Sequence, residues 1–299
     1  MRLAADDRVA TRPDGDATIQ AGFFGPEDAR LFGCLHIPAR SPTAGVLICS
    51  PLHADFVKIY RNEVQLAQRL CSSGFAVLRF HYRGQGHSDG EPDDITFPSL
   101  VGDALIAIEN LRSRTNVSRI GLVGCRVGAL VAAGVGFRLE GAPLVLWEPV
   151  LRPDAYLREA NRSRMISNLS GAVSAGVSSD VRISDLNERG SLDVHGYPIY
   201  RELVQSLQGR SLVEELGDAP RAVRVIQISK SRVVRKDLAA VINRWERLGI
   251  VADVRCVVGE IAWWFRGASA VREQSEAVAE EIARETSGWM TAQFDEGDR

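Results

Sequence analysis

The stretch Ile120-Gly-Leu-Val-Gly-Cys-Arg-Val-Gly-Ala129 places a short apolar run directly before a turn in which two glycines flank an arginine. The run has the length of a buried strand, and the residues that follow have the length and apolar content of a helix. Gly124 and Gly128 allow the strand and the helix to approach closely, because neither carries a side chain. We therefore predict a sharp strand-to-helix turn with Arg126 at its apex.

Apolar runs alternate with helix-length amphipathic stretches on both sides of this turn. Strands that are apolar along their whole length are buried on both faces, as in a parallel sheet between two layers of helices. The pattern predicts a doubly wound, mostly parallel α/β fold, preceded by two antiparallel strands near Thr18–Phe24 and Arg30–Ile37. The apolar runs are Gly45–Cys49, Phe75–Phe80, Ile120–Val123, Pro143–Trp147, Ala222–Ile228 and Val251–Val258, and a last helix is predicted over Ser269–Phe294.

The polar, serine- and arginine-rich residues 152–218 interrupt the alternation. An insertion at this point would lie over the carboxyl ends of the strands, where open α/β sheets bind ligands. We predict a small helical cap over residues 150–218 and a core made of residues 17–149 and 219–299. Residues 1–16 are polar and aperiodic, which predicts a loose tail.

A second motif lies upstream, in Gly74-Phe-Ala-Val-Leu-Arg-Phe-His-Tyr-Arg-Gly-Gln-Gly-His-Ser-Asp-Gly90. Together with the Arg126 turn it resembles the α/β-hydrolase superfamily, in which a strand is followed by Asp-x-x-Gly-x-Gly-x-Ser and a later elbow reads Gly-x-nucleophile-x-Gly. His81 stands where that pattern has its aspartate, whereas Gly84, Gly86 and Ser88 match. Within the capped, serine-aminopeptidase-like hydrolases, the chain is similar to an exosortase-system-associated branch with arginine in the elbow.

The resemblance implies a catalytic triad, but this chain departs from it at each position. Arg126 stands at the nucleophile position, and a guanidinium stays protonated and has no lone pair with which to attack. The acid is expected after the 222–228 strand, where the chain reads Ser229-Lys-Ser-Arg-Val-Val-Arg235 and Asp237 follows in the next helix. No histidine follows His195. Ordinary triad hydrolysis is therefore not expected.

Arg126 needs an anionic partner, because a cation at a helix N-terminus opposes the helix dipole. Glu148 and Glu260 each follow a strand that ends at the same edge of the sheet. One interpretation is an ion pair between Arg126 and either glutamate that fills a vestigial site. The other is that Arg126 binds a ligand carboxylate or phosphate, for which its planar fork is suited.

The loop Ser50-Pro-Leu-His-Ala-Asp55 occupies the place of half the family's oxyanion hole, and His53 there is the histidine best placed for acid–base chemistry. Cys125 is a weaker nucleophile candidate, because a helix N-terminus and an adjacent arginine lower the pKa of a thiol. The candidate catalytic residues are His53, Arg126, His81 and Cys125. The candidate ligand-binding residues are Ser50, Leu52, Asp55, Arg126, Val127, Glu148, Glu260, Trp263 and His195.

The net charge, the cysteines and the spacing of histidines and glycines bear on which partners and cofactors the protein can bind. With 36 basic and 38 acidic side chains the net charge is −2, which offers no electrostatic basis for binding nucleic acid or an anionic membrane. The five cysteines form no CxxC pair, and the N-terminus has no apolar signal segment, so we expect a reduced cytoplasm. The preference for arginine over lysine favours a bacterial source. Dispersed histidines and the glycine spacing predict neither a metal nor a dinucleotide cofactor.

These observations favour a protein that binds an acyl or carboxylate-bearing small molecule and acts without a covalent serine nucleophile, through acid–base or cyclisation chemistry. Two alternatives stay open. One is an ester or thioester hydrolase with displaced catalytic groups. The other is a non-catalytic protein whose capped surface binds a partner.

Overall fold

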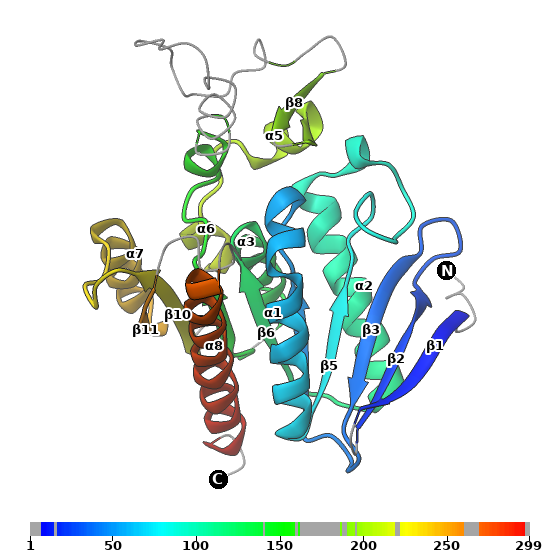
Figure 1. The fold of residues 1–299 in the computed structure, drawn as a ribbon. Coiled ribbons are helices and arrows are strands. Elements are labelled where there is room, and N and C mark those ends of the chain that lie inside the picture. Colours follow the sequence, from blue (N-terminus) through cyan, green and yellow to red (C-terminus); the bar gives the residue numbers. More distant parts are fainter. Residues whose placement is uncertain are drawn as a thin grey trace.

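The computed structural model describes residues 7–14, 17–139, 141–158, 161, 186, 190–194, 196–218, 222–259 and 269–296. Within them a nine-stranded sheet has the order β1-β2-β3-β5-β4-β6-β7-β10-β11 (Figure 1). Neighbours from β5 to β11 run parallel, and β1, β2 and β3 pair antiparallel. The predicted mostly parallel α/β fold is confirmed. The strands are β1 Asp7–Asp14, β2 Ala17–Phe24, β3 Leu31–Ile37, β4 Ala44–Cys49, β5 Phe75–Phe80, β6 Ile120–Cys125, β7 Leu144–Trp147, β10 Ala222–Ser229 and β11 Val251–Val258.

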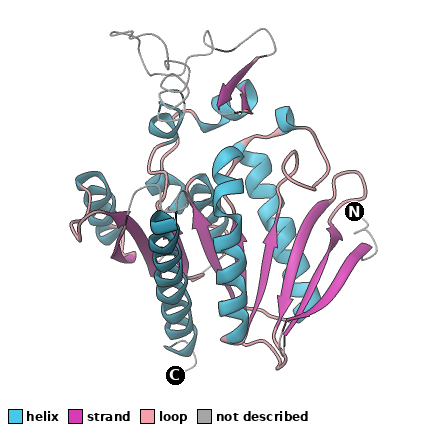
Figure 2. Cartoon of the chain, in the orientation of Figure 1, coloured by secondary structure: helices cyan, strands magenta, loops and turns pink. Residues whose placement is uncertain are grey.

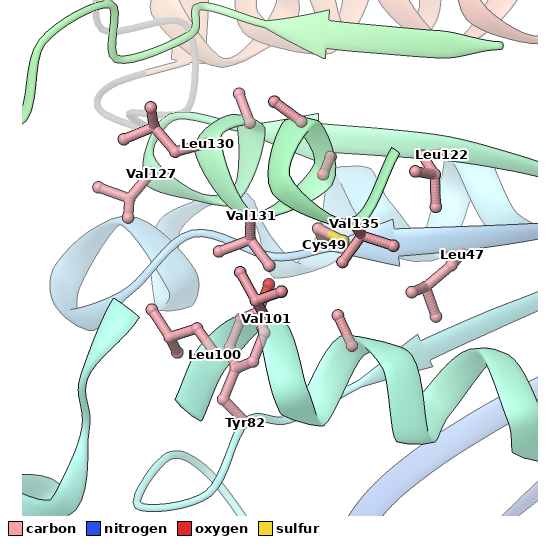
Figure 3. Close-up of a cluster of buried hydrophobic side chains, with 14 of the residues drawn as sticks. Leu47, Cys49, Tyr82, Leu100, Val101, Leu122, Val127, Leu130, Val131 and Val135 are labelled. Carbon is pink, nitrogen blue, oxygen red and sulfur yellow. The ribbon is translucent and has the colours of Figure 1, made fainter. Parts of the chain in front are cut away.

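Helices cover both faces of the sheet (Figure 2). On one face, α1 and α8 pack over an apolar layer that includes Leu66, Leu70 and Ile282. On the other, α2, α3 and α7 form a second layer, and Figure 3 shows its side chains between α2, α3 and the strands. Because β4, β5, β6 and β7 lie between the two layers, each is buried along its whole length. The helices are α1 His53–Ser72, α2 Phe97–Thr115, α3 Val127–Gly136, α7 Lys236–Arg247 and α8 Ser269–Glu296.

The N-terminal segment corrects one expectation. We expected residues 1–16 to form a loose tail, yet Asp7–Asp14 form β1, an edge strand paired with β2. An edge strand exposes one side to solvent and is often polar, so it lacks the apolar signal of a buried strand. Pairing of Asp14 with Ala17 closes the two strands into a hairpin.

The described parts of residues 150–218 contain helical residues 153–158, a hairpin of β8 (Ser191–Val194) and β9 (Tyr197–Tyr200), and the short helices α5 (Arg201–Leu207) and α6 (Leu212–Leu216). Alongside the expected helices, the hairpin is a strand pair that the sequence pattern missed, because each strand has only four residues. β9 contacts α1, α5 contacts α2, and α6 contacts α3 and α7. In Figure 1, β8 and α5 lie beyond the end of the sheet at which α1 begins.

Helix α3 approaches the β4–α1 connection so closely that only glycine fits at position 128. A Cβ there would lie 2.1 Å from the carbonyl oxygen of Cys49 and 2.6 Å from that of Ser50. Both neighbours are backbone atoms, so they cannot move aside as the end of a side chain can.

We expect Gly128→Ala to lower the free energy of unfolding by about 1–3 kcal/mol, the usual cost of an overpacked site. Gly102→Ala is the matched control, because a Cβ at this position of α2 meets nothing within 4 Å. That substitution should raise stability by roughly 0.5–1 kcal/mol, since alanine favours helix over glycine. Urea unfolding of both variants measures the difference, and equal stabilities would contradict the close approach.

Candidate functional site

Three residues with positive φ stand where neighbouring strands end. His53 (φ 55°) begins α1 after β4, Arg126 (φ 53°) follows β6, and Glu148 (φ 40°) follows β7. Strands β4, β6 and β7 are adjacent in the sheet. Non-glycine residues in such conformations cost roughly 1–3 kcal/mol each and concentrate at functional sites. This edge of the sheet is therefore the candidate site.

Arg126 occupies the apex of the predicted turn, as the residue that caps the N-terminus of α3. Its backbone N–H donates to the carbonyl of Trp147 at 3.0 Å. Its own carbonyl accepts from Ala129 at 3.1 Å and from Val150 at 3.2 Å. These hydrogen bonds hold the strained apex against the end of β7. The guanidinium is mostly buried, with a side-chain exposure of 15%.

The guanidinium of Arg126 lies beside Asp55, in the first turn of α1, with Nε 3.5 Å from Oδ2. Its Cζ also lies 5.8 Å from the ring centroid of Tyr156. Of the two glutamates considered as partners of Arg126, Glu260 lies outside the described residues and Glu148 has other partners. Glu148 instead accepts from the backbone N–H of Ile228 and forms an ion pair of 2.8 Å with Arg235.

A pocket of about 530 Å³ opens beside Arg126. Apolar side chains form most of its wall, and arginine, aspartate and serine side chains are placed among them. Such a combination of apolar walls with a few polar groups is typical of small-molecule sites. Its lining residues are Arg126, Pro149, Val150, Leu151, Arg152, Ala155, Tyr156, Ser211, Val213, Arg235, Asp237 and Val241. We call it the Arg126 pocket.

The predicted loop Ser50–Asp55 is shorter than expected, because α1 already begins at His53. His53 and Asp55 are thus helical residues and not loop residues. The Nδ1 atom of His53 is buried with no hydrogen-bond partner in the part of the chain that the structure describes. Burial lowers the pKa of His53 to about 4, so the ring is neutral at pH 7. His53 does not line the Arg126 pocket but lies two residues before Asp55.

Ser50 is held by a residue that sequence reasoning missed. Its Oγ donates to Oε2 of Glu63 at 2.9 Å, and Glu63 is fully buried in α1. Burial raises the pKa of Glu63 to about 7, although Arg79 and the Ser50 hydrogen bond oppose that shift. The sequence does contain a sign of this buried carboxyl group. Glu63 lies four positions after Ile59 and three before Leu66, so it falls on the apolar face that α1 buries.

His81 and Cys125 are placed away from the pocket. The Nδ1 atom of His81 accepts from the backbone of His87 at 3.0 Å, and its ring packs 5.0 Å from that of Phe56. Burial, with smaller effects from His87 and Arg79, lowers the pKa of His81 to about 4. Cys125 is buried in the apolar layer beneath α1 and α8. Burial raises the pKa of its thiol well above its usual value, so the expected lowering is wrong.

The remaining predicted ligand contacts divide into two groups. The side chains of Leu52 and Val127 are buried, which leaves their backbone groups as the means of contact. His195, Glu260 and Trp263 lie outside the described residues. The residues added to the site by the structure are Glu63, Tyr156 and Arg235.

The described ranges contain no sign of a metal centre or of a membrane-spanning helix. No group of three or more His, Cys, Asp or Glu side chains in those ranges is arranged to hold a metal ion. No helix among them is both long and apolar enough to cross a membrane.

The parallel sheet with a strained strand-to-helix elbow after β6 defines an α/β-hydrolase fold. The chain belongs to the serine aminopeptidase S33 family, whose model matches residues 43–213, more than half of its length. No curated protein sequence matches it.

Solved structures of esterases are similar to the chain throughout its length. Est1E from Butyrivibrio proteoclasticus with bound ferulic acid has a TM-score of 0.59 at 16% identity, covering 88% of this chain and 98% of Est1E. An esterase of Pyrococcus furiosus has a TM-score of 0.57 at 15% identity, covering 98% of both chains. A carboxyl esterase from Bacillus coagulans has a TM-score of 0.54 at 14% identity, covering 91% of this chain and 99% of the esterase. At these identities the likeness shows the shared fold.

Glu63 makes the stability of the protein depend on pH. Its pKa rises from 4.5 to about 7 on folding, so the folded state binds more protons than the unfolded state between these values. This contribution to stability is therefore present at low pH and is lost as pH rises from about 4.5 to 7. Glu63→Gln, which keeps an acceptor for Ser50, should be the more stable protein above pH 7, by about 3 kcal/mol.

The measurement is the difference in unfolding free energy between wild type and Glu63→Gln across that pH range. Taking the difference cancels the opposite contributions of His36, His53 and His81, whose pKa values fall on folding. Glu246→Gln, at an exposed position of α7, should give a flat difference. A flat profile for Glu63→Gln as well would show that Glu63 is ionised in the folded protein.

Proposed function

We propose that this α/β-hydrolase-fold protein binds an acyl or carboxylate-bearing small molecule in the Arg126 pocket and acts on it without a covalent serine nucleophile. The observation that carries the proposal is a guanidinium at the apex of the strained elbow, on the wall of a pocket of about 530 Å³. That group cannot attack a carbonyl, but it can bind an oxyanion through two parallel hydrogen bonds.

The surroundings of Arg126 support this role. Asp55 neutralises the guanidinium in the absence of a ligand, but its contact of 3.5 Å is longer than an ordinary charge-assisted hydrogen bond. A ligand carboxylate that binds more closely can take its place. The apolar wall formed by Val150, Leu151 and Val213 suits the hydrocarbon part of an acyl compound.

Acid–base chemistry is the part of the proposal that His53 supports. Its ring is neutral at pH 7, and Nδ1 has no hydrogen-bond partner within the described chain, so its lone pair is available, although a pKa of about 4 makes it a weak base until a bound ligand changes its surroundings. General acid–base catalysis contributes roughly 10²–10⁴-fold to a reaction rate. Proton transfer of this kind permits reactions such as cyclisation, in which no acyl-enzyme forms.

We further propose that residues 150–218 act as a cap. The support is that Leu151, Tyr156 and Val213 come from this segment and line the same pocket as Arg126. A reduced cytoplasmic setting in a bacterium is proposed on the free state of Cys34, Cys49, Cys71, Cys125 and Cys256 and on the arginine-rich composition.

A second candidate function is ester or thioester hydrolysis with displaced catalytic groups. Membership of the serine aminopeptidase family and the likeness to esterases favour it. Est1E, which holds ferulic acid, is a hydrolase-fold protein with a carboxylic acid in its structure, so the likeness is compatible with both candidates. Activity assays distinguish them.

The binding proposal predicts that a carboxylate such as octanoate or ferulate raises the melting temperature and gives saturable heat in titration calorimetry. Arg126→Gln should weaken binding by about tenfold or more, because a charge-assisted hydrogen bond contributes about 1.5–3 kcal/mol. Arg126→Lys should fall between the two, since lysine keeps the charge but not the fork. Arg61→Gln, at an exposed position of α1, is the control and should bind like wild type. Unchanged binding in Arg126→Gln would overturn the proposal.

The absence of an acyl-enzyme is tested by intact-mass analysis with activated esters and acyl thioesters. We expect no covalent adduct and no turnover with wild type, Arg126→Ala or Cys125→Ala. An adduct that forms in wild type and is lost in Cys125→Ala would instead establish a nucleophilic hydrolase. An adduct retained in Cys125→Ala would place the nucleophile elsewhere and favour the second candidate.

A further inference from the structure

The two edge strands of the sheet, β1 and β11, differ in how well they are protected against pairing with another chain (Figure 1). Strand β1 has the features by which natural proteins prevent edge pairing, namely a bulge between Arg8 and Ala10, a proline at Pro13 and several charged side chains. Strand β11 has eight residues, no proline and an unbroken register with β10. Among the strands that the structure describes, none pairs with the outer side of β11.

The pairing of β11 with β10 determines which backbone groups point outward. The N–H of Gly259 donates to the carbonyl of Ser229 at 3.0 Å, so Gly259 bonds toward β10. Successive residues of a strand direct their backbone groups to opposite sides in alternation, so residues 251, 253, 255 and 257 also bond toward β10. The N–H and C=O groups of residues 252, 254, 256 and 258 therefore point away from the sheet, in one row along its edge.

Exposed valines accompany this row of backbone groups. Val251 is 74% exposed and Val258 is 47% exposed, at the two ends of the strand. A long edge strand with exposed apolar side chains is a template for pairing with a further strand. In such pairing the main-chain hydrogen bonds supply most of the affinity, and the side chains select the partner and the register.

The sequence of β11 is complementary to itself when two copies run antiparallel about Val254. Asp253 of each copy then lies opposite Arg255 of the other, and Val254 lies opposite Val254. The flanking pairs are Ala252 with Cys256 and Val251 with Val257. Residues 252, 254 and 256 of each copy meet the same outward-pointing residues of the other, so donors face acceptors along the whole contact.

Charge selects this register among the alternatives. Opposite charges directly across a pair of strands are stabilising, and like charges are destabilising. Centring the pair on Asp253 would place two aspartates opposite each other, and centring it on Arg255 would place two arginines opposite each other. The arrangement about Val254 avoids both contacts.

Both charged side chains also have partners within their own chain. Asp253 accepts from Arg224 at 2.7 Å, and Arg255 lies 3.2 Å from Glu285. The side chains of Asp253 and Arg255 are still 51% and 43% exposed, so a facing strand can approach them without breaking these ion pairs. Because the charges are already paired, the contact across the two copies fixes the register more than it adds attraction.

We propose that the protein forms a two-fold symmetric dimer in which the β11 strands of two copies pair antiparallel about Val254 and join the two sheets into one. The partner is a second copy of this chain, because the strand is complementary to its own sequence, as a two-fold interface requires. This inference goes beyond the proposed function and does not depend on ligand binding in the Arg126 pocket.

The first test is the mass in solution, measured by sedimentation velocity at loading concentrations from roughly 1 to 100 µM. Wild type should approach twice the 32.7 kDa of one chain as the concentration rises. Asp253→Arg and Arg255→Asp each place like charges opposite each other at both symmetric positions. Each variant alone should therefore dimerise about tenfold more weakly.

An equal mixture of Asp253→Arg and Arg255→Asp should restore the dimer. In the mixed pair, the new arginine lies opposite the new aspartate, and the two unchanged residues also have opposite charges. Each variant loses an ion pair within its own chain, but that loss is the same in the mixture. Recovery on mixing therefore reports the pairing of the strands and its register.

A matched pair of valine substitutions tests the apolar part of the surface. Val251→Lys should weaken the dimer by roughly tenfold, since a lysine on an edge strand opposes pairing with another chain. Val233→Lys is the control, because Val233 is 72% exposed but lies in the connection between β10 and α7. Its dimer should be as stable as that of wild type. Far-ultraviolet circular dichroism of each variant checks that the fold is retained.

Three results would overturn the proposal. The first is a wild-type protein that stays monomeric over the whole concentration range. The second is a dimer that forms equally well in Asp253→Arg, Arg255→Asp and wild type, which would place the interface elsewhere. The third is a mixture of the two charge variants that dimerises no better than either variant alone, which would contradict the register about Val254.

Discussion

The close approach of α3 to the end of β4 is the constraint on which the rest of this structure depends. At Gly128 the backbone of the helix lies so near the carbonyl groups of Cys49 and Ser50 that no side chain fits. This contact forces the chain to reverse within one residue after β6, and Arg126 takes a positive φ at the apex as a result. The elbow geometry of a nucleophile is thereby preserved, although the residue it presents is a guanidinium.

Buried polar side chains order the neighbouring connections. Glu148 and Gln227 hydrogen-bond to backbone groups of β10 and of the connection to α7, while Glu63 accepts from Ser50 on the other side of the elbow. Leaving such groups without partners inside a protein costs about 1–3 kcal/mol each, so their hydrogen bonds restrict the loops strongly. The edge of the sheet that forms the candidate site is therefore rigid around Arg126 and Arg235. A rigid site loses less conformational entropy when a ligand binds to it.

Charge is distributed in the site as ion pairs and not as a net excess. Arg126 is near Asp55, and Arg235 is near Glu148. The whole chain has a net charge of −2, so its composition gives no sign that three arginines line one pocket. Under the proposed function, the affinity of such a site for an anion would depend on geometry more than on long-range attraction.

The sequence alone determined the α/β class, the positions of the buried strands along the chain and the sharp turn at Arg126, because these follow from the local spacing of apolar residues and glycines. It did not reveal the polar edge strand β1 or the short β8–β9 hairpin, whose residues lack the pattern of a buried strand. Only the tertiary structure decided that Arg126 lies beside Asp55, that Glu148 pairs with Arg235, and that Glu63 lies under Ser50. Such partners are separated along the chain, and which of several carboxylates reaches a given cation depends on where strand ends and helix starts meet in space.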